Sequence, residues 1–66
     1  MSRSYEIIER VGISTVSISD AINSVVQEAN KEKSVSWFEA VEFRGRVTSE
    51  GKLEHQVTVK IGRKTE

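Results

Sequence analysis

The chain has 66 residues, with ten basic and ten acidic side chains, no cysteine and one histidine. Its length allows one domain, residues 1–66, and a chain this short buries only about 60% of the surface that its unfolded form exposes. The absence of cysteine excludes disulfides and thiolate metal sites, and a single histidine argues against a zinc site, so we expect no metal site and expect self-association to supply the missing stability.

The charge balance and the hydropathy pattern narrow the range of partners. A net charge near zero argues against nucleic acid or a membrane surface as the main partner, because both attract a basic excess. No apolar run is long enough to span a bilayer, and the N-terminal segment lacks the apolar core of a signal peptide. We therefore expect a cytoplasmic protein that binds neither nucleic acid nor membrane.

The first predicted element is a strand over residues 4–12, where aromatic and β-branched residues are frequent and Gly12 is expected to end the strand. A helix over residues 18–32 follows, because apolar residues recur with the spacing of one helix face: Ile18, Ala21, Ile22, Val25 and Ala29. Ser17 is suited to the N-cap, and the carboxylate of Asp20 favours the positive end of the helix.

Two further strands are predicted over residues 35–48 and 52–63, joined by three loop residues that end in Gly51. Such a loop suits a hairpin whose last loop residue takes a positive φ. Pairing Thr48 with Lys52 sets the register. One face of the hairpin is then apolar, and the helix is expected to cover it: Val47 opposite Leu53, Phe43 opposite Val57, and Val41 opposite Val59. The other face is polar, with Arg46 opposite Glu54, Arg44 opposite Gln56, and Glu42 opposite Thr58.

The order of the elements is β-α-β-β, which indicates an α+β protein. The crossover through the helix makes the first two strands run in the same direction. Placing the third strand between them makes every neighbouring pair antiparallel. The sequence therefore predicts a three-stranded antiparallel sheet, in strand order 1-3-2, wrapped around one helix.

Trp37, the only tryptophan, is the first candidate binding residue. Polar Ser36 and Glu39 lie near it on an early part of a strand, so its π face is suited to stacking on a flat ring. Packing in the core beneath the helix is the alternative. Phe38 alternates with Trp37, so one of these two aromatic side chains must point away from the helix and needs covering.

Three polar residues of the hairpin are further candidates. The Gln56 amide offers a donor and an acceptor to the edge of a heterocycle, and the guanidinium groups of Arg44 and Arg46 match phosphate oxygens. The alternatives are a solvated strand residue for Gln56 and a surface pair of Arg46 with Glu54 that contributes little.

No catalytic residue is expected. His55 has no serine or cysteine nucleophile placed beside it by a motif, and no pair of carboxylates lies in an apolar setting that would tune an acid or a base. The dinucleotide-binding fingerprint of nicotinamide-dependent enzymes is also absent. We expect a binding protein and not an enzyme.

Over nearly its whole length the chain resembles the dodecins, small flavin-binding proteins of bacteria and archaea. The resemblance covers the segments VGIS, DAINSVVQEA, SWFEAVEFRG and HQVTVKIG. Its most specific parts are Trp-Phe-Glu followed by Arg-Gly beginning at Arg44, and Gln56 followed by Val-Thr-Val. The chain departs from bacterial members at Ile61-Gly62-Arg63-Lys64, where they commonly read Val-Gly-Phe-Arg.

The resemblance implies the β-α-β-β fold and a homododecamer that forms a hollow shell. It implies that Trp37 stacks on the isoalloxazine ring, with two flavins between symmetry-related tryptophans at a two-fold axis. It also implies that Gln56 meets the flavin edge and that Arg44, and by a weaker match Arg46, lie near the ligand. The arginine of the bacterial type favours FMN as the cofactor, with riboflavin, FAD and coenzyme A as alternatives.

The function that follows is storage or sequestration of flavin, with photoprotective quenching by the electron-rich indole. The alternative is a structural or ligand-carrier assembly that holds coenzyme A or a metal ion and has no flavin role. The register places Trp37 on the opposite face from Arg44 and Gln56, so the site requires either a bulge between Trp37 and Val41 or residues from more than one subunit.

Overall fold

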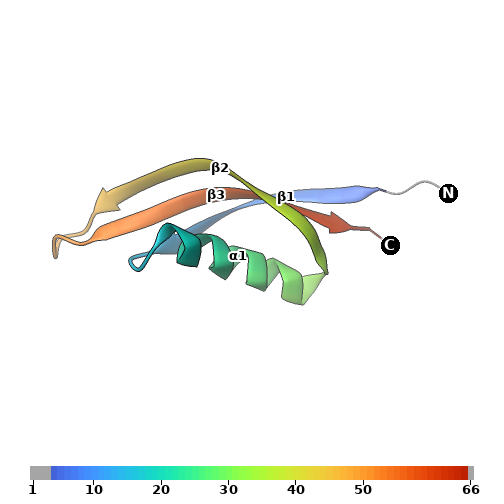
Figure 1. Ribbon diagram of the computed structural model, residues 1–66, viewed down its shortest axis with the longest axis horizontal. Helices are drawn as coiled ribbons and strands as arrows, with labels where there is room; N and C mark the ends of the chain where they lie inside the picture. Colours follow the sequence, from blue (N-terminus) through green and yellow to red (C-terminus); the bar gives the residue numbers. More distant parts are fainter. Residues whose placement is uncertain (1–3, 66) are drawn as a thin grey trace.

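The computed structural model describes residues 4–65, and the single domain predicted over residues 1–66 extends beyond them at both ends. Its elements are β1 (Tyr5–Ser14), α1 (Ile18–Glu32), β2 (Val35–Val47) and β3 (Leu53–Lys64). The strands form one antiparallel sheet in the order β1-β3-β2, and α1 lies against one of its faces (Figure 1). The predicted fold class, strand order and helix bounds are confirmed.

Side-chain hydrogen bonds fix the start of α1 directly after β1. The Oγ atom of Ser17 accepts a hydrogen bond of 2.9 Å from the backbone N–H of Asp20, as expected for an N-cap. The Oγ atom of Ser14 donates to a carboxylate oxygen of Asp20 at 2.7 Å and accepts from the backbone N–H of Val16 at 2.9 Å. These contacts orient the helix against the last residue of the strand.

Gly12 lies inside β1, which continues to Ser14, so the prediction that Gly12 ends the strand is wrong. A Cβ atom at Gly12 would overlap the backbone carbonyl of Ala21. The absence of a side chain therefore allows α1 to approach the sheet closely.

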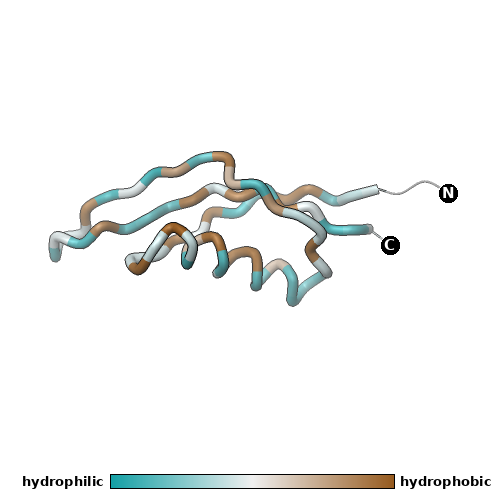
Figure 2. The backbone as a smooth tube through the Cα atoms, in the orientation of Figure 1, coloured by the Kyte–Doolittle hydropathy of each residue, from teal (hydrophilic) through white to brown (hydrophobic). Residues whose placement is uncertain are grey.

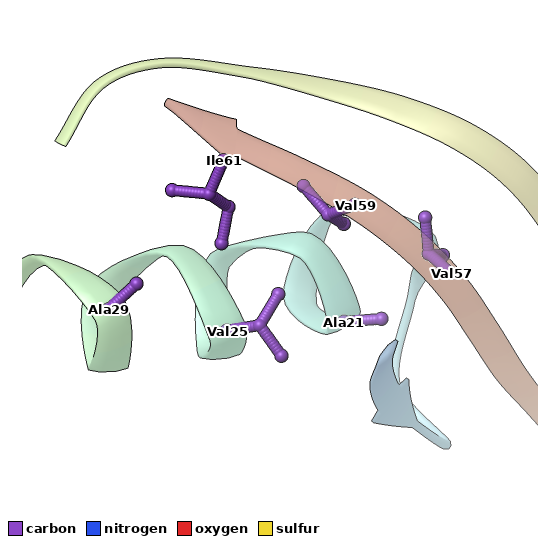
Figure 3. Packing of buried hydrophobic residues seen from close by; sticks show 6 residues of the cluster. All are labelled: Ala21, Val25, Ala29, Val57, Val59 and Ile61. Carbon is purple, nitrogen blue, oxygen red and sulfur yellow. The ribbon is translucent and has the colours of Figure 1, made fainter. Parts of the chain in front are cut away.

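The core is small and lies between α1 and the central strand β3 (Figure 3). Its buried members are Ala21, Val25 and Ala29 from the helix and Val57, Val59 and Ile61 from the strand. Many other apolar side chains are exposed. Hydrophobic residues occur along all three strands (Figure 2). A monomer with this much exposed apolar surface is expected to associate with other copies.

The helix does not cover the whole apolar face of the β2–β3 hairpin, contrary to the prediction. Phe43, Val47 and Leu53 are 58%, 64% and 61% exposed. A helix of 15 residues is about 22 Å long, whereas the longest dimension of the chain is 53 Å. The hairpin therefore extends past the helix (Figure 1).

The hairpin register is as predicted near the turn and changes at Val41. The backbone N–H of Thr48 donates to the carbonyl of Lys52 at 2.8 Å, and Gly51 has a φ of 82°. Predicted pairs from the turn to Glu42 are confirmed, but Val59 pairs with Ala40 and not with Val41. Val41 is an extra residue, which makes a β-bulge.

Arg63 is buried on the helix side of β3, at the C-terminal end of α1. Its guanidinium donates hydrogen bonds to Glu6 at 2.8 Å, to Glu32 at 3.2 Å and to the carbonyl of Ala29 at 3.5 Å. Arg10 also donates to Glu32, at 2.8 Å. These ion pairs tie β1, the end of α1 and β3 together.

Replacing Arg63 by methionine is expected to lower the free energy of unfolding by about 2 kcal/mol at pH 7, because buried hydrogen bonds to charged groups are lost. Hydrogen bonds from Arg10 and then Arg63 lower the pKa of Glu32 in the folded state. The stability from this carboxylate is therefore present above its pKa in the unfolded chain and is lost as pH falls through the folded value.

Denaturant unfolding of the parent and of Arg63→Met at pH 7 and at lower pH measures both effects, and the variant should lose less stability on acidification. Lys31→Met, which removes an exposed cation, is the matched control. Equal stability of the parent and Arg63→Met at pH 7 would contradict the structural role assigned to this arginine.

Helix α1 is the one helix within residues 4–65, and it lacks the length and hydropathy that a membrane-spanning helix requires.

Candidate functional site

Trp37 lies on the face of the sheet that α1 does not cover. Directly paired residues of an antiparallel sheet point to the same face. Phe38 pairs with Ile61, whose side chain points toward the helix (Figure 3). Trp37 pairs with Gly62, one position along both strands, and so lies on the opposite, outer face.

The indole of Trp37 rests on the backbone of Gly62. A Cβ atom at Gly62 would overlap three indole atoms, Cε2, Nε1 and Cζ2, so the ring lies flat where a side chain would otherwise stand. Gly62 is buried, whereas Trp37 is 37% exposed and lies outside the core cluster. One side of the ring is thus held by the sheet, and its uncovered side has the flat π surface on which a planar ligand could stack.

The bulge at Val41 places the candidate residues on one face. Without an extra residue, the alternation of side chains along β2 would put Trp37 and Arg44 on opposite faces. With it, Arg44 lies on the outer face, paired with Gln56, and Arg46 lies beside it, paired with Glu54. The first of the two solutions expected from the sequence is therefore present in the structure.

The two ends of this face are far apart within one chain. Trp37 pairs with Gly62 and Arg44 pairs with Gln56, and the two β3 positions are separated by six residues. At a rise of about 3.3 Å per residue, this separation is roughly 20 Å, which exceeds the length of a three-ring heterocycle. The structure therefore brings Arg44, Arg46 and Gln56 together and leaves Trp37 apart from them.

Glu54 connects two of the clustered residues. Arg46 donates hydrogen bonds to both of its carboxylate oxygens, at 2.7 Å and 3.5 Å, which confirms the predicted pair. The Nε2 group of Gln56 donates to the same carboxylate at 3.1 Å. The bond from Arg46, followed by that from Gln56, lowers the pKa of Glu54.

Sequence reasoning noted Glu54 only as a partner of Arg46. The signal for its contact with Gln56 was the spacing of two residues on one strand, which places both side chains on one face. Arg44 differs from Arg46, since it has no side-chain hydrogen bond or ion pair with any residue of the described range 4–65. Its guanidinium is therefore the more available of the two for a ligand.

His55, the only histidine of the chain, pairs with Gly45 on the helix side of the sheet. A groove on that side is lined by Ile18, Phe43, Val47 and Leu53 among others. Of the candidate residues, Arg44 and Arg46 contribute to its lining, and Trp37 and Gln56 do not. Within residues 4–65, no group of three histidine, cysteine, aspartate or glutamate side chains could hold a metal ion.

Comparison with known sequences gives one family over almost the whole chain. The sequence model of the family described as Dodecin matches residues 4–66. A curated dodecin of Thermus thermophilus is 33% identical over 63 residues, which are 94% of this chain and 91% of that protein.

Solved structures agree with this result. The dodecin from Streptomyces davaonensis has a TM-score of 0.88 and 28% identity, covering 100% of this chain and 98% of its own. A calcium-chelating antigen of Mycobacterium tuberculosis, described as a calcium dodecin, has a TM-score of 0.85 and covers 96% of this chain and 91% of its own. Its identity is 23%, so this likeness concerns the fold alone.

Proposed function

The chain belongs to the dodecin family, and on that premise we propose that it binds oxidised flavin, FMN in particular, for storage, sequestration and photoprotective quenching. Dodecins are small flavin-binding proteins of dodecamer type, and they are binding proteins and not enzymes. The proposal extends this family property to a particular ligand and to particular residues of this chain.

The observation that carries the proposal is the indole of Trp37 laid on Gly62 with its other side uncovered. An electron-rich indole stacks well on the electron-poor isoalloxazine ring. The excited flavin takes an electron from the indole, and the electron then returns, so light energy is lost as heat without net oxidation of either ring. Stacking thus supports both retention and quenching.

The ligand collects its contacts from two copies of the chain. The separation of roughly 20 Å between Trp37 and Gln56 along the strand excludes one flavin ring from touching both within one subunit. An isologous contact between two copies places Trp37 of each copy opposite the Gln56 and Arg44 of the other. Such a contact creates two equal sites, in line with two flavins at a two-fold axis of a homododecamer.

Exposed apolar side chains support this self-association. On the outer face of β1 they are Tyr5, Ile7, Val11 and Ile13, all more than 40% exposed. Their burial between copies would supply the stability that a single chain of this size lacks.

Arg44, Arg46 and Gln56 lie together on the outer face and would contact the edge and the phosphate of the ligand. Gln56 meets the edge of the ring, and Arg44 meets the phosphate of FMN because its guanidinium has no other partner within residues 4–65. Arg46 is held by Glu54 and contributes less to the phosphate. FMN is therefore expected to bind more tightly than riboflavin.

Titration of FMN fluorescence with the purified protein tests the proposal. The expected result is saturating loss of FMN emission and a yellow protein after loading. A colourless assembly that leaves FMN emission undiminished would contradict the proposal. That outcome would favour the alternative of a structural or ligand-carrier assembly, which binding of coenzyme A or of a metal ion would then test directly.

A further inference from the structure

We propose that Glu54 is a positioning residue, which turns the Gln56 amide so that it accepts only one order of donor and acceptor on the ligand edge. The inference rests on the proposed flavin site and deepens it. Glu54 itself does not touch the ligand. It acts through Gln56.

The geometry puts the carboxylate of Glu54 between Arg46 and Gln56 on the outer face of the hairpin. Oε1 of Glu54 accepts from Nε of Arg46 at 2.7 Å and from Nε2 of Gln56 at 3.1 Å. The Glu54 side chain is 17% exposed, whereas that of Arg46 is 60% exposed. The Glu54 side chain is thus mostly covered, and its carboxylate accepts hydrogen bonds from both neighbours.

The negative charge of Glu54 determines which end of the Gln56 amide faces it. Two contacts with a guanidinium keep Glu54 ionised, and an ionised carboxylate can only accept hydrogen bonds. The Gln56 amide must therefore turn its NH₂ group toward Glu54, because the opposite rotamer would place the amide oxygen against a negative charge. One N–H is used in this contact, and the carbonyl oxygen and the second N–H remain for a ligand.

The free edge of the amide matches one class of ring. An acceptor next to a donor is complementary to a lactam or imide edge, in which a ring N–H stands beside a carbonyl. The isoalloxazine ring has such an edge, with N3–H flanked by two carbonyl groups, so the fixed direction of the amide decides which of the two carbonyls accepts from Gln56. A ring that carries a methyl group on that nitrogen has no donor for Oε1 of Gln56, so it is excluded.

The same carboxylate restrains Arg46. Its guanidinium is committed to Glu54. Arg46 thereby helps to keep Glu54 ionised and oriented, and its effect on a ligand passes through Glu54 and Gln56. This arrangement explains why two arginines on one face would contribute differently to binding.

A double-mutant cycle with riboflavin as the probe tests the inference, since riboflavin lacks the phosphate that Arg44 would bind. Glu54→Gln preserves the shape of the side chain but can donate as well as accept, so the direction of the Gln56 amide is no longer fixed. We expect the dissociation constant for riboflavin to rise about tenfold, the effect of one misdirected hydrogen bond. In a Gln56→Ala background, the same change should alter it less than about twofold.

A second measurement uses the parent protein alone and needs no variant to fold. The parent should bind riboflavin at least about tenfold more tightly than N3-methylriboflavin. Equal binding of the two compounds would overturn the inference, as would an equal effect of Glu54→Gln with and without Gln56. If the parent fails to quench flavin at all, the proposed function fails. If the parent quenches and Glu54→Gln binds equally well, only the positioning role of Glu54 is wrong.

Discussion

Replacing Trp37 by alanine is expected to weaken FMN binding by about 10- to 100-fold, since stacking on an aromatic side chain contributes about 1–3 kcal/mol per ring. Most of the quenching should disappear with it, because the indole is the proposed electron donor. The indole lies outside the core cluster, on the face opposite the helix. The fold of the variant should therefore be retained. A fluorescence titration of FMN, with circular dichroism as the check of folding, measures both points.

Two further variants distinguish the contribution of the aromatic ring from that of the glycine on which it rests. Trp37→Phe keeps a smaller and less electron-rich ring, so its affinity and quenching should fall between those of the parent and of Trp37→Ala. Gly62→Ala keeps the indole but places a methyl group where the ring rests, and should also weaken binding. Unchanged quenching in Trp37→Ala would refute the assignment of Trp37 as the stacking residue.

Mixed assemblies of Trp37→Ala and Gln56→Ala should recover tight binding that neither variant has alone. If each site takes its tryptophan from one copy and its glutamine from another, random mixing of equal amounts leaves about a quarter of the sites with both residues. The measurement is the amplitude of tight FMN quenching after the two variants are unfolded together and refolded. A site built within one chain would give no recovery.

A chain that carries both substitutions provides the control for this experiment. Mixed in equal amounts with the parent, it should also leave about a quarter of the sites intact, because each intact site needs a parental chain on both sides. If the mixture of Trp37→Ala and Gln56→Ala recovers tight quenching with the same amplitude as this control, the site is shared between copies. If that mixture recovers none while the control mixture still binds, the whole site lies within one subunit.

Helix α1 and the turn of the hairpin could be predicted because their signals are local. The helix has an apolar stripe with the helical period and a serine N-cap that binds Asp20, and its predicted and observed bounds agree. The turn has a glycine at the one position that takes a positive φ. Each of these features depends on residues that are close together in the sequence.

The bulge could not be located from the sequence. Ala40 and Val41 are both apolar, so the alternation of polar and apolar residues does not reveal which of them pairs with Val59. The shift of one residue decides on which face Trp37 lies, and therefore whether it is a core residue or a platform. The register places Trp37 on the outer face, and its role as a stacking residue stays a prediction.

Three other residues had roles that only the tertiary structure could reveal. Gly12 is needed for the close approach of Ala21, and Arg63 is buried by carboxylates from β1 and α1. Glu54 was predicted as a partner of Arg46, but its bond to Gln56 depends on side-chain orientation. Each of these residue types has several common roles in proteins. Which role applies depends on neighbours that are distant in the sequence.

Native mass spectrometry of the FMN-loaded parent tests whether flavin binds between copies of this chain. Flavin should be carried only by oligomers, with equal numbers of flavins and subunits in a dodecamer. A 7.4 kDa monomer that retains one flavin with quenched emission would contradict it.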